Sequence, residues 1–531
     1  MKRMVLLGMF VLLATGLLCL SGCEETRVTK TQVAAVLDSL EMKLDWTARQ
    51  MARHRWGQVY TGKADSLEYY RGLWNYVVSD PQALSVLDEG RRLVDEGIQQ
   101  RRWELAFRAV KRGQVDGNNE VAKLERKLRN YYSRFRTVSD EGSITSRVLQ
   151  ERIANSADPV EREMAYRSWA AIGADAADDV ARLIRMRNQI ARRSGFVGYF
   201  NLALDQQEID RQQYLDLLDH VDSVTSLAYD SVIYELHAEL GQETIAIWDL
   251  DYAHRQVQSD LDAFLPVDSQ LDVVSLSLLG LGLNLDALPI YVDYSPEKQM
   301  STSYVVSTIE PAYDVRAAFN LRDGVGPTGT YLRGMGSAVF GAYVTQDEPL
   351  FDRTVPECWV AGIAYLFQQL ASRRDWLTTY ANVPVSMADE YTDTESRHRI
   401  INLRKLLLQA RFEYEAYQDP NRDLNKLYWD LFEQILRLPR HDDLKPWANE
   451  PAFVSRPVSI QNDLIGQMIA AQTIAFLEGS YGELVGNATI GAFITQNYLR
   501  FGSRYPWQEL LQRGTDEPLN PEHLYRDLNL L

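Results

Sequence analysis

Cysteine is scarce in this sequence. The 531 residues include three cysteines: Cys19 and Cys23 lie within the first 23 positions, and Cys358 is alone in the rest of the chain. A framework of internal disulfides is therefore excluded. Because no histidine is near Cys358 in the sequence, we expect a buried free thiol there rather than a catalytic one.

Histidine is equally sparse, and the seven histidines are widely dispersed. No two are closer than 17 residues, so neither His-x-His nor His-x-x-x-His occurs. Such pairs place two imidazoles on one face of an element, which is the usual start of a zinc site. A metal site would have to be assembled from distant residues, and we expect none.

Positive charge is also in deficit. Lysine and arginine number 56 against 73 aspartates and glutamates, which gives a formal net charge of −17. A surface of this sign repels nucleic acid and anionic lipid, so neither is expected to bind the folded body.

The N-terminus has the pattern of a lipoprotein signal. Lys2 and Arg3 precede an apolar run that is short for a membrane span and ends in Leu-Ser-Gly-Cys at 20–23. We therefore expect a signal peptide at 1–22 and lipidation of Cys23. An uncleaved membrane anchor is the alternative.

The lipid on Cys23 would be the membrane contact of the mature chain. Glu24 follows it, where an aspartate would favour retention in the inner membrane. We therefore expect attachment to the outer membrane of a bacterial envelope, with the chain facing the periplasm or the exterior. Residues 23–30 would be the lipidated cysteine and its tether.

The remainder, 31–531, is expected to be a single domain of mainly α class. Apolar residues recur at helical spacing, and no repeat or low-complexity linker divides the chain. The period changes to two at 290–294, 303–309 and 315–321, where prolines punctuate the pattern, so a small sheet is expected there.

Two further helices are expected within 328–370, on either side of a polar loop at 345–353. This layout resembles the zinc-binding helix pair of the gluzincin metallopeptidases, and most closely the angiotensin-converting-enzyme-like family. In that family the first helix holds His-Glu-x-Gly-His-Ala, and a glutamate ligand follows about two dozen residues later. The resemblance implies a large helical body whose two halves flank a central cleft.

The residues that perform zinc chemistry in that family are replaced here. The hexad at 333–338 is Arg-Gly-Met-Gly-Ser-Ala, which puts Arg333 and Ser337 at the histidine positions and Gly334 at the general base. Ala361 stands where the third ligand would be. Arginine presents only donors and a fixed positive charge, so it repels a cation. We expect zinc to be lost and catalysis with it.

The resemblance extends over nearly everything after the tether and is strongest at 160–205 and 315–525. The segment 453–466 is similar to the family's His-Pro-Val-Tyr-x-Gln-Asn-Tyr-x-x-Gly, with Arg456 at the histidine and Gln461 matching. It implies substrate contacts from Arg333, Arg456 and Gln461. The two arginines would form an anion site for a carboxylate, or they would pair with resident acids.

Glu357 is the one carboxylate close to the third-ligand position. Thr-Val-Pro-Glu at 354–357 has the form of a capping box, with proline in the first turn of a helix. We therefore expect a capping role for Glu357 rather than a ligand role.

The residues together favour a catalytically inactive, metallopeptidase-like lipoprotein that binds peptides or a protein partner in its cleft. One alternative is an active hydrolase with a non-standard site, for which Cys358 and Ser337 are the candidates. Another is an accessory subunit of an active relative. We therefore expect neither enzymatic activity nor a bound cofactor.

Overall fold

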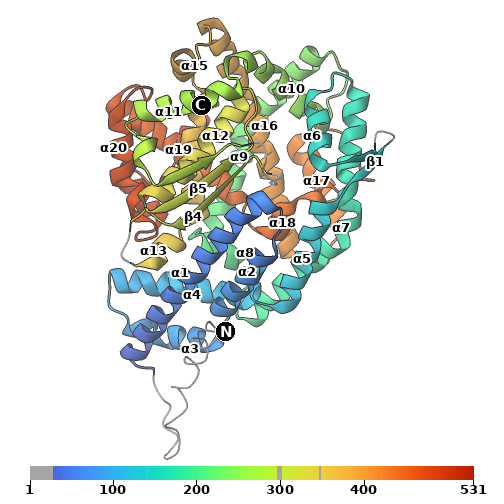
Figure 1. Ribbon diagram of the computed structural model, residues 1–531. Coiled ribbons are helices and arrows are strands. Elements are labelled where there is room, and N and C mark those ends of the chain that lie inside the picture. The colour runs from blue at the N-terminus through green and yellow to red at the C-terminus, as the bar shows by residue number, and fades with distance from the viewer. Residues whose placement is uncertain (1–27, 140–141, 296–301, 346–347) are drawn as a thin grey trace, which may run out of the picture.

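The computed structural model describes residues 28–139, 142–295, 302–345 and 348–531, and Figure 1 shows its course. The chain is 74% helix and 4% strand, so the expected mainly α class with a small sheet is confirmed. Cys23 and most of the tether lie outside the described residues. Within the part that the structure describes, no helix has the length and apolarity needed to span a bilayer.

The N-terminal helices lie at the bottom of Figure 1 and along one side of the sheet. α1 begins with a capping box in which Thr29 and Gln32 exchange hydrogen bonds, and it ends at Gly62, whose left-handed φ of 63° suits glycine. The helices of this part are α1 (Lys30–Thr61), α2 (Asp65–Val78), α3 (Pro81–Glu89), α4 (Ile98–Asp116) and α5 (Asn119–Arg134).

The other helices build the body. A small hairpin, β1 (Thr137–Ser139) with β2 (Gly142–Ile144), precedes them. The middle of the chain supplies α6 (Ser146–Asn155), α7 (Pro159–Arg193), α8 (Tyr199–Gln206), α9 (Arg211–Leu240), α10 (Ile247–Ser259) and α11 (Val267–Gly280). The last third supplies α12 (Val325–Tyr343), α13 (Pro349–Arg353), α14 (Glu357–Gln368), α15 (Arg374–Tyr380), α16 (Val385–Gln418), α17 (Leu424–Leu436), α18 (Pro451–Ser455), α19 (Ile460–Tyr481), α20 (Ala488–Asn497), α21 (Trp507–Thr515) and α22 (Glu522–Asp527).

The three strands expected from the period of two are all present. They are β3 (Ile290–Asp293), β4 (Tyr304–Glu310) and β5 (Asp314–Phe319), in the order β3-β5-β4, with β3 parallel and β4 antiparallel to β5. On one face Val305 and Ala318 pack with Trp56 and Val59 of α1. On the other face α12 comes so close that a Cβ on Gly341 would lie 2.5 Å from Thr308 Oγ1. β4 is therefore an edge strand held between two helices.

The expected helix pair at 328–370 is also confirmed, as α12 and α14. The polar loop between them contains a short helix, α13, which the sequence reading did not anticipate. α14 packs against α19 at two glycines, where an added Cβ would meet the partner helix: 2.6 Å from Ile469 Cγ2 at Gly362 and 2.8 Å from Ala361 Cβ at Gly466. Close backbone approach thus fixes α14 relative to α19.

Candidate functional site

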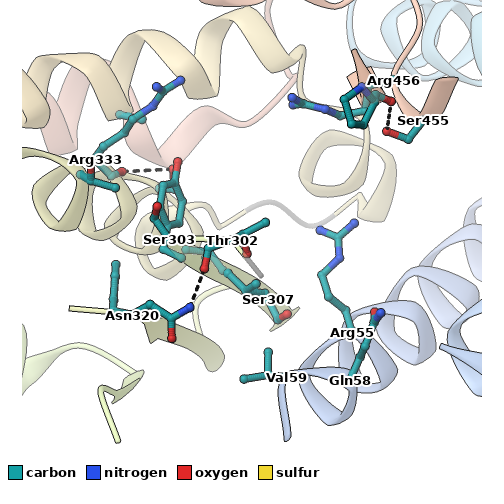
Figure 2. Close-up of a pocket in the computed structure, with 18 of the residues that line it drawn as sticks. Arg55, Gln58, Val59, Thr302, Ser303, Ser307, Asn320, Arg333, Ser455 and Arg456 are labelled. Carbon is teal, nitrogen blue, oxygen red and sulfur yellow. Dashed lines mark hydrogen bonds between the residues drawn. The ribbon is translucent and has the colours of Figure 1, made fainter. Parts of the chain in front are cut away.

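A large pocket runs between α1, α5, β4, α12, α14 and α18. Its volume is about 2670 Å³, and the residues that line it range from Ala48 to Asp463 in the sequence. The lining contains neither histidine nor cysteine among the described residues. Figure 2 shows Arg55 and Gln58 of α1 on one side of the pocket, with Arg333 and Arg456 on walls formed by later segments.

Three of the four positions that the resemblance assigned to zinc chemistry meet in this pocket. Arg333 and Ser337 line it from α12, and Ala361 lines it from α14. Three of the positions aligned by the resemblance therefore line one pocket. Ser337 Oγ is 3.4 Å from the carbonyl oxygen of Arg333, one turn earlier on the helix, to which it donates.

Gly334 is the exception, because it is buried against the sheet rather than open to the pocket. A Cβ at this position would lie 2.4 Å from Phe319 Cε1 and 3.1 Å from Tyr304 Cδ2. Real Cβ atoms do not approach ring carbons so closely, so a larger residue at 334 requires Phe319 to move.

Arg333 is engaged by an acid of the protein itself. Its Nη2 donates to Asp463 Oδ1 at 2.6 Å, the Tyr365 hydroxyl donates to the same oxygen at 2.9 Å, and the guanidinium lies 4.0 Å from the centre of the Tyr365 ring. Burial lowers the pKa of Arg333, but Tyr365 and Asp463 outweigh it and raise that pKa above its usual value. Of the two interpretations offered for Arg333, the geometry supports pairing with a resident acid.

These side chains do not fit the zinc ion that the resemblance implies. A paired guanidinium occupies one position, and Ala361 offers no donor atom. Among the described residues, no group of three or more His, Cys, Asp or Glu is arranged to hold a metal ion.

Arg456 differs from Arg333. It follows α18 as its C-cap residue, its side chain is exposed and lines the pocket, and no acid among the described residues pairs with it. Gln461 is 1% exposed, is not part of the lining, and donates to the carbonyl of Val458. The expectation that Gln461 contacts a substrate does not agree with this placement.

The capping box expected at 354–357 is wrong. α14 begins at Glu357 after Pro356, with no side-chain cap, and Thr354 donates to the carbonyl of Leu350 instead. Proline at the N-cap lacks the side-chain oxygen that a box needs, so the local pattern was misread. The Glu357 carboxylate lines the pocket and accepts from Asn462 Nδ2 at 3.1 Å.

The outer edge of β4 faces the pocket with main-chain groups. Asn320 N–H donates to the carbonyl of Ser303 at 2.8 Å, and in the observed register this pairs every second residue of β4 with β5. The N–H and C=O groups of Tyr304 and Val306 therefore point away from the sheet, and both residues line the pocket. An extended chain could pair with this edge.

Arg353 closes one end of that edge. Its guanidinium donates to the carbonyls of Thr308 and Ile309 at 3.2 and 3.0 Å, and to Asp45 of α1 at 3.0 Å. The arginine thus joins α1 to the end of β4, and the open part of the edge is the stretch before Thr308.

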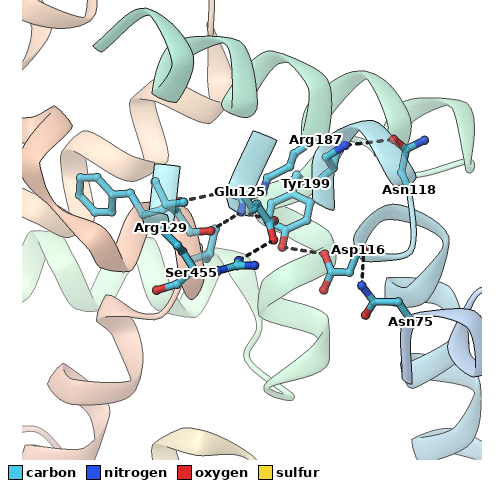
Figure 3. Close-up of polar contacts among 12 residues, drawn as sticks. Asn75, Asp116, Asn118, Glu125, Arg129, Arg187, Tyr199 and Ser455 are labelled. Carbon is cyan, nitrogen blue, oxygen red and sulfur yellow. Dashed lines mark hydrogen bonds and ion pairs between the residues drawn. The ribbon is translucent and has the colours of Figure 1, made fainter. Parts of the chain in front are cut away.

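A buried arginine on α7 positions the wall that carries Arg456. Arg187 is 0% exposed and donates to the carbonyls of Phe453 and Val454 on α18, at 2.8 and 2.6 Å, and to Glu125 of α5 at 2.6 Å. Figure 3 shows Glu125 lying between Arg187 and Arg129. No local sequence pattern identifies the partners of Arg187, because they are 62 or more residues away in the chain.

Cys358 is fully buried, as expected, and forms no disulfide with any residue that the structure describes. Burial raises the pKa of its thiol well above the usual range, so the sulfur stays protonated and unreactive.

Sequence reasoning missed Arg55. It belongs to α1, its side chain is exposed within the pocket, and it has no ion-pair partner among the described residues. No local pattern marks it, since α1 reaches the pocket only through tertiary packing.

No family model and no curated protein matches this sequence. The relationship to the peptidase family therefore stays a prediction based on the motifs quoted above.

Proposed function

We propose that this chain is an envelope lipoprotein with the body of an angiotensin-converting-enzyme-like gluzincin, and that it binds peptides in its pocket without hydrolysing them. The observation that carries the proposal is the convergence of Arg333, Ser337 and Ala361 on one large pocket. The spacing of these three residues in the sequence matches that of the ligands in a zinc peptidase, but their side chains are not zinc ligands. Cys23 would attach the protein to the membrane through its lipid.

Peptide binding is supported by the edge of β4. Main-chain groups of Tyr304 and Val306 supply donors and acceptors to an extended peptide, and this pairing requires no metal. The volume of about 2670 Å³ exceeds what a drug-sized ligand fills, so several residues of a peptide fit.

The hydrolase alternative has less support. Ser337 has no histidine beside it in the pocket lining, and Cys358 is buried as a neutral thiol. An accessory role beside an active relative is compatible with peptide binding and would appear as co-purification of the two proteins.

The test uses the full-length protein in detergent and a library of fluorescent peptides followed by anisotropy. We expect saturable binding that is unaffected by chelator and produces no cleavage products. N-methylation of alternate peptide nitrogens should weaken binding in one register only, because only every second N–H faces β4. Chelator-sensitive cleavage would refute the inactive assignment, and absence of peptide binding would refute the role of the pocket.

Attachment is tested separately. Replacement of Cys23→Ser should move the protein from the membrane fraction to the soluble fraction or leave it unprocessed. A protein that stays membrane-bound and correctly processed after this change would contradict the lipid anchor.

A further inference from the structure

The pocket wall has the opposite charge to the rest of the protein. Nine arginines and no lysine line it, against four acidic residues, whereas the whole chain has a net charge of −17. A concave wall of one sign concentrates ligands of the other sign. Arginines that form ion pairs within the protein must be subtracted from this excess of positive charge.

Five of these arginines are paired with acids, as Arg333 is with Asp463 and Arg353 with Asp45. The remaining four are Arg55, Arg134, Arg136 and Arg456, and no acid among the described residues pairs with them. Their charge is available to a ligand.

Arg55 and Arg456 reach into the same region of the pocket from opposite walls (Figure 2). Desolvation lowers the pKa of Arg55; Glu357 opposes this effect, and the nearby positive charge of Arg456 adds to it. Glu357 is not within ion-pairing distance of either guanidinium and is bonded to Asn462. Glu450 also lines the pocket and interacts electrostatically with Arg456, and it accepts from the N–H of Ala452. Neither carboxylate forms an ion pair with Arg55 or Arg456 among the described residues, so an anion from outside would stabilise the two cations further.

We infer that the pocket selects acidic peptides, with a carboxylate held between Arg55 and Arg456 while the peptide backbone pairs with β4. This inference rests on the proposed peptide-binding function and adds the chemical class of the ligand. Guanidinium groups bind carboxylates through paired N–H donors, which suits a glutamate or aspartate side chain or a C-terminal carboxylate. The open edge of β4 favours a peptide over other polyanions, because a polysaccharide cannot continue a sheet.

The backbone just before Arg456 is anchored to α7. Phe453 and Val454 of α18 accept hydrogen bonds from Arg187 through their carbonyls. Anchoring of this backbone lowers the ordering cost when Arg456 binds an anion.

The experiment compares three fluorescent peptides of one length and backbone: a glutamate-rich peptide, its glutamine counterpart and a lysine counterpart. Full-length protein in detergent is titrated with each. We expect the glutamate peptide to bind about tenfold or more tightly than the glutamine peptide, and the lysine peptide to bind most weakly. Equal binding of glutamate and glutamine peptides would overturn the acidic preference but leave the proposed function intact, whereas absence of all binding would overturn both.

Matched variants locate the contact. Arg55→Met and Arg456→Met should each lower the affinity for the glutamate peptide about tenfold and leave the affinity for the glutamine peptide unchanged. Neither arginine has an ion-pair partner in the described part of the chain, so both variants should fold as the parent does. Arg440→Met removes a partly exposed arginine outside the pocket, paired with Asp442 at 2.6 Å, and should change nothing. Equal losses in all three variants would contradict the proposed contact.

A final arm separates peptides from anions in general. Dextran sulfate should compete poorly with the glutamate peptide at equal charge concentration. N-methylation of the glutamate peptide should weaken its binding. A general anion site would give strong competition and no effect of N-methylation, and that result would overturn the inference.

Discussion

Replacement of Arg187→Met tests whether one buried side chain both stabilises the fold and positions the pocket wall. Methionine keeps most of the volume of arginine but none of its donors. The change removes the bonds to the carbonyls of Phe453 and Val454 and the ion pair with Glu125. The two carbonyls are left without these donors in the interior, and Glu125 retains only its longer contact with Arg129 at 3.3 Å.

The expected magnitude follows from these losses. An orphaned buried acceptor costs about 1–3 kcal/mol, so two carbonyls and a weakened ion pair give a loss of about 3–5 kcal/mol in unfolding free energy. With an unfolding entropy of roughly 2 cal/mol/K per residue, a chain of this size loses about 1 kcal/mol for each degree of melting temperature. Differential scanning calorimetry should therefore show a decrease of about 3–5 °C.

The second readout is the pocket. Since Arg187 holds the end of α18, its loss should also weaken binding of the glutamate peptide through Arg456. Arg162→Met is the matched control on the same helix: Arg162 is 1% exposed and donates to the buried Asp249 at 2.6 and 2.9 Å, but neither residue lines the pocket. It should destabilise the protein to a similar degree without affecting peptide binding.

Two results would refute this reasoning. A decrease below about 1 °C for Arg187→Met would mean that the carbonyls find other donors at no cost. Equal peptide affinities for the Arg187 and Arg162 variants would mean that α18 keeps its position without the arginine. An exposed control, Lys426→Met, breaks a surface pair that is worth only about 0.2–0.5 kcal/mol.

Three further predictions concern packing, pH and thiol chemistry. Gly466→Ala should destabilise the protein by about 1–3 kcal/mol, because its Cβ would meet Ala361 Cβ at 2.8 Å, whereas Gly479→Ala on the same helix meets nothing within 4 Å and should be neutral or stabilising in thermal denaturation. Burial raises the pKa of Glu413 to about 8, so the folded state keeps a proton that the unfolded state releases near pH 4.3. The free energy of unfolding should therefore fall as the pH rises from about 4.3 to about 8, and Glu413→Gln should flatten this dependence in urea titrations. Cys358 should resist alkylation in the native protein and react once in denaturant, and rapid native labelling would contradict its burial.

The sequence predicted those parts of the structure that local patterns encode. The three strands were placed to within two residues, because alternation and proline mark both the faces and the ends of a strand. The helix pair α12 and α14 was found from apolar spacing, and α13 was missed because five residues are too few to show a helical period. Helix boundaries that depend on a capping residue were predicted less accurately. Thr-x-x-Glu at 354–357 matches the capping-box motif, but Pro356 is the N-cap of α14.

The charged partnerships of the site were beyond such patterns. The acid that pairs with Arg333 is Asp463, 130 residues later in the chain. An ion pair of this kind is set by the crossing of α12, α14 and α19. No periodicity within one helix contains that information. Arg55 was missed for the same reason, since nothing in α1 indicates which of its arginines will face the pocket.

Gly334 bears on whether the proposed loss of catalysis could be reversed by restoring four side chains. In the proposed register a glutamate belongs at 334, yet any Cβ there lies 2.4 Å from the ring of Phe319. That ring packs edge-on against Tyr331, with 4.5 Å between the ring centres, and lies 6.1 Å from the ring of Tyr304 at the start of β4, so any shift of Phe319 disturbs both contacts. Reversion would require repacking the interface between α12 and the sheet, including the edge to which a peptide would bind. In the proposed register, the packing of Phe319 and the lack of a glutamate at 334 therefore depend on each other. A variant with histidines at 333 and 337 and an unchanged Phe319 should gain metal affinity but no peptidase activity.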